Sequence, residues 1–275
     1  MSIEVLTDRE ELKNFLTRDR VGNAYLLGDL DPAYLPYCTW FGLRVDGELA
    51  ALVLLYHGLR LPVVLLASSA APAEEAPAHR SERLRVLLRG LESRIPQRLW
   101  VHAWEEHGPV AEEFFKETAF KRMIRMGLER GSYERPVCKR EVEGRVRRLE
   151  HKDTAMIVGL YQHFPDNFFE PYLLETGLYF GIEREDRREL AGIAGIHVHS
   201  RTYDIAAIGN LVVHPDCRRQ GLATALTSRL LDELFKTVSL VTLNVEEGNM
   251  SAIGTYKKFG FVPHRVYFEG NVETK

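Results

Sequence analysis

The spacing of apolar and polar residues predicts strands alternating with helices along all 275 residues of the chain. Short apolar runs typical of strands are separated by stretches with leucines three and four positions apart, the spacing of one helix face. In the first half the predicted elements are a helix over 8–17, a hairpin turning at Asp46-Gly47, a strand over 61–67, a helix over 80–94, a strand over 99–104, a helix over 109–118 and a strand over 120–128.

The second half repeats this order of elements. Its predicted elements are a strand over 142–149, a helix from the Asp153-Thr154 cap to 161, strands over 178–183, 190–199 and 204–213, a helix over 222–236, a strand over 238–245, a helix over 249–259 and a last strand over 261–268. A polar stretch without a clear period, containing Pro136, separates the halves. The pattern therefore predicts an α/β fold with mixed sheets, in two tandem domains over 1–135 and 143–275 with a linker over 136–142.

Composition and charge narrow the class of protein. A hydrophobic fraction of 45% and a charged fraction of 27% are typical of a globular chain. A net charge of -3 argues against a nucleic-acid partner, which needs a broad positive surface. Three cysteines without a paired motif indicate neither a disulfide framework nor a zinc site. No apolar run reaches membrane-spanning length, so we expect a cytoplasmic protein without a membrane partner. We expect it to be a monomer or a homodimer.

The stretch from Ile208 to Thr224, IGNLVVHPDCRRQGLAT, is the strongest candidate for chemistry. A run of β-favouring residues stops at Pro215, which has no N–H for a sheet, and a basic turn leads into a helix. Because a helix start carries unpaired N–H groups and a partial positive charge, it attracts phosphate. The turn lacks the Lys of a P-loop and two of the three glycines of a dinucleotide fingerprint.

Two segments carry a resemblance to a known family. Arg218-Arg219-Gln220-Gly221-Leu222-Ala223 is similar to the Arg/Gln-x-x-Gly-x-Gly/Ala signature of the GCN5-related N-acetyltransferases (GNAT). About thirty residues later the same family pattern continues in Asn249, Ala252, Tyr256 and Phe259-Gly260-Phe261. The resemblance covers 144–268 well and the first half only in outline. The first half has no comparable basic turn, so we expect a degenerate GNAT-like domain there.

The resemblance implies an N-acetyltransferase that uses acetyl-CoA as the acyl donor. Its pyrophosphate would lie over the N–H groups of 220–224, and its pantetheine amides would pair with 211–213 in a gap between strands. A backbone N–H of Val212 or Val213 would stabilise the oxyanion of the tetrahedral intermediate. The implied donor-binding residues are Leu211, Val212, Val213, Arg218, Arg219, Gln220, Gly221, Leu222, Ala223, Thr224, Asn249 and Tyr256.

The resemblance also implies that an amine attacks the thioester directly, with Tyr256 as the general acid that protonates the CoA thiolate. A helix tyrosine that packs on the sheet is the alternative for Tyr256, and Asn249 is also a preferred helix cap. The general base stays open among Asp204, His197, His199 and Glu170. No metal is expected.

The acceptor amine is not defined by the sequence, and a small molecule or a peptide amine fits equally. An aromatic segment over 162–177 is a candidate wall of its pocket, through Phe168, Glu170 and Tyr172. A protein of another class, a non-catalytic acyl-CoA-binding regulatory module, would keep the basic turn without acylating anything.

Overall fold

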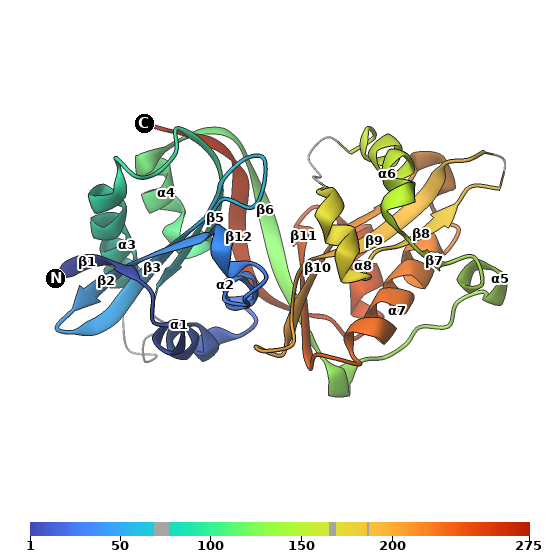
Figure 1. Cartoon of the computed structure of the whole chain (residues 1–275), viewed down its shortest axis with the longest axis horizontal. Coiled ribbons are helices and arrows are strands. Elements are labelled where there is room, and N and C mark those ends of the chain that lie inside the picture. Colours follow the sequence, from blue (N-terminus) through green and yellow to red (C-terminus); the bar gives the residue numbers. More distant parts are fainter. Residues whose placement is uncertain (69–76, 165–168, 186) are drawn as a thin grey trace. The chain divides into compact units, whose positions relative to one another are not determined.

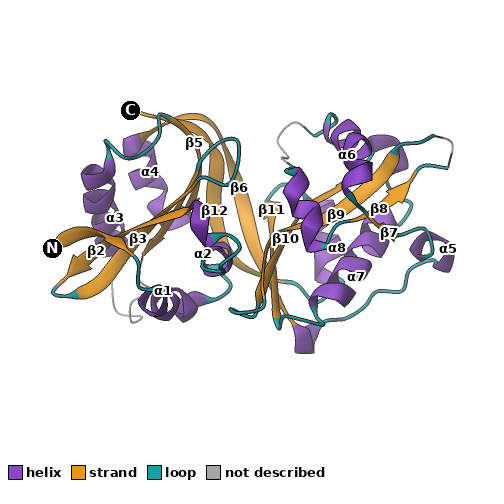
Figure 2. Ribbon diagram, in the orientation of Figure 1, coloured by secondary structure: helices purple, strands orange, loops and turns teal. Residues whose placement is uncertain are grey.

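The computed structural model describes residues 1–68, 77–164, 169–185 and 187–275. The chain forms two compact units, each a mostly antiparallel sheet flanked by helices (Figures 1 and 2). Unit 1 comprises Met1–Arg125, Val245–Gly248 and Pro263–Lys275, and unit 2 comprises Met126–Asn244 and Asn249–Val262. The predicted α/β fold with mixed sheets is confirmed.

The sheet of unit 1 has the strand order β1-β2-β3-β4-β5-β12-β6. β4 and β5 are parallel, whereas β1 to β4 and the β5–β12 pair are antiparallel. The strands are β1 (Ser2–Leu6), β2 (Cys38–Val45), β3 (Glu48–Tyr56), β4 (Val63–Ser68), β5 (Arg98–Trp104), β6 (Phe115–Glu129) and β12 (Val262–Thr274), and the helices are α1 (Arg9–Leu16), α2 (Ala24–Asp29), α3 (Pro77–Leu91) and α4 (Gly108–Phe114).

The two faces of this sheet carry different side chains. On β5, Val101 and Ala103 join the leucines of α3 in one buried core. His102 lies between them in sequence and so points to the opposite face, because side chains alternate along a strand. Its ring lies 6.1 Å from the ring of Tyr25 on α2. One face is therefore an aliphatic core and the other is aromatic and polar.

The strand that completes unit 1 comes last in the chain. β12 pairs with β5 from Tyr267, opposite Trp104, to Glu273, opposite Arg98. The compact units thus divide the chain at Arg125 and again near its end, rather than at 136–142. The division of the chain into two domains over 1–135 and 143–275 therefore stays a prediction.

The sheet of unit 2 has the order β6-β11-β10-β9-β8-β7. β10 and β11 are parallel, and the pairs from β7 to β10 are antiparallel. The strands are β7 (Arg147–Arg148), β8 (Phe180–Glu183), β9 (Leu190–Ser200), β10 (Ile205–Val213) and β11 (Leu240–Glu246), and the helices are α5 (Arg140–Glu143), α6 (Thr154–Tyr161), α7 (Leu222–Leu234) and α8 (Met250–Lys257).

Helices α6 and α7 cover opposite faces of this sheet. A Cβ placed on Gly192 of β9 would meet Leu226 of α7, whereas one placed on Gly195 would meet the ring of Tyr179. Positions three apart on a strand point to opposite faces. Tyr179 lies on the α6 face, where its ring and that of Tyr161 both contact Phe169. The two faces of β10 therefore have different neighbours.

Several predicted elements differ from the structure. The helix predicted over 8–17 is α1, Arg9–Leu16, and its N-cap is Asp8, because the Asp8 carboxylate accepts hydrogen bonds from the N–H groups of Glu10 (2.9 Å) and Glu11 (3.2 Å). The helix predicted over 109–118 ends at Phe114, where β6 begins. The strand predicted over 142–149 is reduced to β7, next to α5. Strand β1 and helix α2 were not predicted.

No helix among the described residues is long and apolar enough to cross a membrane.

Candidate active site

The strand that leads to the basic turn contains a β-bulge. Gly209 of β10 pairs with Gly195 of β9, and Val212 pairs with Ile193, so two residues, 210 and 211, face one residue of β9. Asn210 adopts a positive φ of 54° to make this possible. A bulge re-aims the backbone groups beside it, and such bulges recur next to active sites.

Beyond the middle of β10, its pairing with β11 ends. The register runs from Ile205 opposite Leu240 to Ile208 opposite Leu243, and no further pair of these two strands occurs among the described residues. β10 continues to Val213 and β11 to Glu246. The sequence-based expectation of a gap between strands beside 211–213 therefore has a counterpart in the structure.

Two tyrosines hold the bulge from the α6 face. Tyr161 donates a hydrogen bond of 3.3 Å to the carbonyl oxygen of Asn210, and the Asn210 amide donates one of 3.0 Å to the Tyr179 hydroxyl. Tyr179 in turn donates to the carbonyl of Ile196 at 2.8 Å. All three polar side chains are buried, so these bonds are shielded from water. In the sequence, Asn210 is a polar residue within an otherwise apolar strand.

The turn after β10 has an unusual backbone. Residues 215–217 form one 3-10 turn, Arg218 is extended, and Arg219 and Gly221 have positive φ values of 62° and 82°. Glycine adopts this conformation without steric cost, whereas an arginine in it is strained. Such strain is concentrated at ligand-binding loops.

The basic turn and the start of α7 form an open, positively charged surface. Arg218, Arg219, Gln220 and Gly221 are exposed, and an added Cβ on Gly221 would meet no atom within 4 Å. Within the described part of the chain, neither arginine forms an ion pair. Leu222 is buried and anchors the helix, while Ala223 and Thr224 are half-buried. These residues suit an anion cradle made of helix N–H groups and two guanidinium groups.

Helix α8 begins at the same edge of the sheet as α7, because each helix follows the carboxyl end of one of two parallel strands. The Asn249 side chain caps α8 by accepting a hydrogen bond of 3.1 Å from the Ala252 N–H. Tyr256 is buried, with its ring 5.9 Å from that of Phe261. Burial raises the pKa of Tyr256 to about 12, so this phenol keeps its proton at neutral pH.

The candidate bases lie in different places. Asp204 stands at the far end of β10 from the turn, and its carboxylate accepts hydrogen bonds from the N–H and hydroxyl of Ser239. His199 is hydrogen-bonded to Thr237 at 2.9 Å. His197 lies against Gly209, where β10 leaves β11. The structure therefore brings His197 to the gap and does not bring Asp204 or His199 there.

The aromatic segment lies on the α6 face. Phe169 contacts the rings of Tyr161 and Tyr179, with ring centroids 6.1 and 5.9 Å apart. Glu170, which follows it, is half-buried and begins a 3-10 turn, and Tyr172 is 36% exposed. Phe168 lies outside the described residues.

A cavity of about 330 Å³ borders the start of the turn. One wall is α6 and the other is the beginning of β9 together with His214. The His163 and His214 rings meet edge-on there at 4.5 Å. The volume is within the range of small-molecule pockets. The described residues contain no cluster of His, Cys, Asp or Glu suited to a metal ion.

Residues 146–261 match the model of the Acetyltransferase (GNAT) family. Residues 146–261 therefore form a GNAT domain.

Solved structures extend the likeness to the whole chain. A Drosophila protein superimposes with a TM-score of 0.69 at 16% identity, covering 98% of each chain. A tandem GNAT protein from the clavulanic acid biosynthesis pathway superimposes with a TM-score of 0.60 at 15% identity, covering 99% of this chain and 98% of that one. At these identities the likeness shows the fold, and it shows that the first half shares it.

A curated relative matches over a short stretch. The [ribosomal protein bS18]-alanine N-acetyltransferase of Escherichia coli (strain K12) is 44% identical over 59 residues, 21% of this chain. The match spans 40% of that relative's length. The Shigella flexneri protein of the same name matches with the same figures.

Proposed function

We propose that unit 2 is an acetyl-CoA-dependent N-acetyltransferase. The observation that carries the proposal is the parting of β10 and β11 after Ile208, directly before a basic turn whose backbone is open at Gly221. The gap offers strand edges to the pantetheine amides, and the turn offers N–H groups and guanidinium groups to the pyrophosphate. GNAT proteins typically use acetyl-CoA, which supports this choice of donor.

The reaction is the transfer of an acetyl group from sulfur to nitrogen. The amine nitrogen attacks the thioester carbonyl and gives one proton to a base. The carbon–sulfur bond then breaks, so that the acetyl group stays on the amine and CoA departs as a thiolate. A backbone N–H of Val212 or Val213 stabilises the negative oxygen of the intermediate. Tyr256 gives its proton to the departing thiolate, and its raised pKa keeps that proton in place until the thiolate forms. His197 is the candidate base beside the gap, because it lies against Gly209.

The acceptor we propose to test first is a peptide that begins with alanine. The support is the match to the alanine N-acetyltransferase, which covers 59 residues. A small amine is the other acceptor class, for which the cavity beside His163 and His214 has room.

The experiment measures free-thiol release from acetyl-CoA by the whole chain, with alanine-initiated peptides and a panel of small amines. We expect release that depends on both the amine and the enzyme, with acetylated amine formed in equal amount. Acetyl-CoA binding without release for any amine would reject the enzyme. That result would favour the alternative of a non-catalytic acyl-CoA-binding module.

A further inference from the structure

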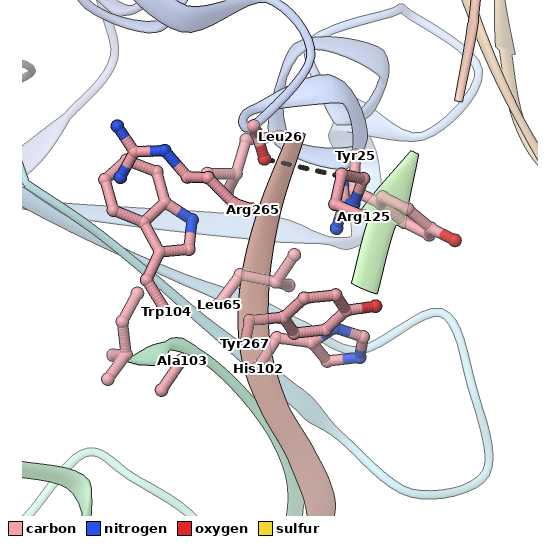
Figure 3. A pocket seen from close by; sticks show the side chains of 11 residues that line it. Tyr25, Leu26, Leu65, His102, Ala103, Trp104, Arg125, Arg265 and Tyr267 are labelled. Atoms are coloured by element: carbon pink, nitrogen blue, oxygen red, sulfur yellow. Dashed lines mark hydrogen bonds between the residues drawn. The ribbon is translucent and has the colours of Figure 1, made fainter. Parts of the chain in front are cut away.

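Two cavities among the described residues differ in what they can hold. The cavity of unit 1, lined by residues of β4, β5, α2 and β12 among others, has a volume of about 20 Å³, which is room for about one water molecule (Figure 3). The cavity of unit 2 that borders His214 has a volume of about 330 Å³, within the range of small-molecule pockets. Of these two, the cavity of unit 2 has room for an organic molecule.

The cavity of unit 2 adjoins the end of β10. His214, which follows Val213 of that strand, forms part of one wall, and its backbone N–H donates a hydrogen bond of 2.8 Å to the carbonyl of Ala191 on β9. The opposite wall is α6, whose Tyr161 holds the bulge of β10. Because we place the thioester carbonyl at the N–H of Val212 or Val213, a molecule in this cavity would lie beside the strand end that binds the donor.

The floor of the cavity is apolar, whereas its rim is charged. Leu160 of α6 and Leu190 of β9 are buried, and Met156 of α6 is half-buried. Arg188 and Glu189, between β8 and β9, are exposed and also line the cavity. Within the described ranges, neither of these two side chains forms an ion pair or a hydrogen bond. The cavity therefore presents one cation, one carboxylate and an apolar floor to a ligand.

His214 adds a hydrogen-bond donor. Its Nδ1 accepts a hydrogen bond of 3.2 Å from the N–H of Asp216 and lies 3.4 Å from a terminal nitrogen of Arg184. A neutral imidazole that accepts at Nδ1 carries its proton on Nε2. The Nε2–H makes no hydrogen bond within the part of the chain that the structure describes, so it can donate to a ligand.

A molecule that carries a carboxylate, an ammonium group and an apolar part matches these features. A guanidinium group binds a carboxylate through two parallel hydrogen bonds, and a carboxylate side chain attracts an ammonium group. We propose that the cavity of unit 2 binds a free α-amino acid with an apolar side chain as the acceptor. Its carboxylate lies on Arg188, its ammonium group toward Glu189 and its side chain against Met156. This assignment rests on the acetyl transfer proposed for unit 2.

The product of the reaction is an N-acetyl amino acid. The ammonium group loses one proton, and its nitrogen attacks the thioester carbonyl and loses a second proton as the carbon–nitrogen bond forms. The carbon–sulfur bond breaks. One of the two protons ends on the CoA sulfur and the other in solvent.

The test compares L-leucine with L-leucinamide, which has the same side chain and an α-amine but no carboxylate. Titration calorimetry of the whole chain in the presence of CoA measures their binding without acetyl transfer. We expect leucine to bind at least tenfold more tightly, and thiol release from acetyl-CoA to show the same preference in kcat/KM. The amine of leucinamide is the less basic of the two, so reactivity alone would favour the amide. Equal binding of the two compounds would overturn the proposal.

Arg188→Gln should weaken leucine binding at least tenfold and change leucinamide binding less than twofold, because it removes the partner of the carboxylate. Arg201→Gln is the matched control, since Arg201 is an exposed arginine of unit 2 that does not line the cavity. It should bind both compounds as the wild type does. An equal loss of leucine binding in the two variants would assign the effect to net charge and overturn the role of Arg188.

Gly159→Phe should fill the cavity from α6. A Cβ on Gly159 would meet no atom within 4 Å, and glycine is unfavourable inside a helix, so we expect this variant to fold. It should abolish leucine binding and leave CoA binding unchanged. Val158→Phe adds a ring at an exposed position of the same helix outside the cavity, and it should change neither. Wild-type leucine binding in Gly159→Phe would overturn the proposal.

The outcomes separate this proposal from the function on which it rests. Acetyl transfer to alanine-initiated peptides without any binding of leucine would overturn the proposal and leave the N-acetyltransferase intact. Leucine that binds through Arg188 and is not acetylated, while a peptide is, would overturn its role as the acceptor. CoA binding without transfer to any amine, peptides included, would reject the N-acetyltransferase itself.

Discussion

The hydroxyl of Tyr161 on α6 holds the carbonyl of Asn210 at the bulge of β10, with a hydrogen bond of 3.3 Å. Because the bulge sets the direction of the N–H groups of Val212 and Val213, Tyr161→Phe should lower kcat about fivefold, the value of one buried hydrogen bond. The KM for acetyl-CoA should change less than twofold. Tyr133→Phe is the control, since Tyr133 donates to Asp232 elsewhere in unit 2. Equal kcat in both variants would contradict a role in positioning the bulge.

Tyr256→Phe should lower kcat by about a hundredfold, the smaller end of what general acid catalysis contributes, while acetyl-CoA binding stays within about twofold. The raised pKa of Tyr256, about 12, keeps the phenol protonated between pH 6 and pH 9. We therefore expect no fall in rate over that interval from loss of the Tyr256 proton. Pre-steady-state thiol release as a function of pH measures both effects. If Tyr256→Phe released thiol at the wild-type rate, another group would have to protonate the thiolate.

Gly221→Glu should abolish acetyl-CoA binding, measured by titration calorimetry. An added Cβ would meet no atom within 4 Å, so we expect the effect to come from a negative charge at the anion cradle and from the positive φ of 82°. Gly47→Glu introduces the same charge at an exposed glycine of unit 1 that also has a positive φ, 89°, and open space around it, and this variant should bind acetyl-CoA normally. Comparable affinities in the two variants would show that the donor phosphates lie elsewhere.

Asp204→Asn should lower the free energy of unfolding by about 1 kcal/mol and leave kcat unchanged. The Asp204 carboxylate accepts hydrogen bonds from the N–H and hydroxyl of Ser239, and charged acceptors make the stronger bonds. Asn tolerates the positive φ of 56° at this position, so the backbone is preserved. Urea unfolding and the thiol-release assay separate the two effects. A large loss of kcat at unchanged stability would restore Asp204 as the base.

Asp29→Asn should make stability less dependent on pH. Burial raises the pKa of Asp29 to about 8, so the folded chain keeps this proton while the unfolded chain loses it near pH 4. Asp29 therefore does not lower the free energy of unfolding below about pH 4. Between about pH 4 and pH 8 it lowers that free energy by up to about 1.4 kcal/mol per pH unit.

The variant removes this contribution and should be more stable than the wild type at pH 8.5. Urea unfolding at pH 5, 7 and 8.5 measures it, with the exposed Asp46→Asn as the control in the same unit. A parallel dependence on pH in Asp29→Asn and the wild type would mean that Asp29 ionises in the folded state as it does in the unfolded one.

Sequence reasoning placed the strand, turn and α7 of unit 2 well because these depend on local chemistry. Pro215 ends a strand and Gly221 permits a left-handed start to a helix whatever surrounds them. It could not show that β10 leaves β11 at Ile208, since that depends on a partner more than thirty residues away. The sequence also did not predict the hydrogen bonds of Tyr161 and Tyr179 with Asn210, because contacts across a sheet face leave no periodic pattern in the sequence.

The missed elements of unit 1 have similar causes. Residues 24–29 are too short to show a helical period, and Asn23 makes no side-chain cap. Strand β1 is an edge strand whose apolar residues Ile3 and Val5 are exposed, so its alternation does not mark a buried face. The sequence also could not show which candidate base lies beside the gap, because this depends on tertiary contacts. In the structure His197 lies against Gly209.

The position of β12 has a consequence for how the protein is made. A ribosome extends the chain from its N-terminus, so the residues that pair with β5 emerge only after all of unit 2 has been synthesised. Until then β5 presents an unpaired edge beside the aromatic face that carries His102 and Trp104, and such edges invite wrong partners. The sheet of unit 2 does not wait for this last segment, because unit 2 ends at Val262, before the final residues of unit 1. The half of the gene read first therefore encodes the unit whose sheet is completed last.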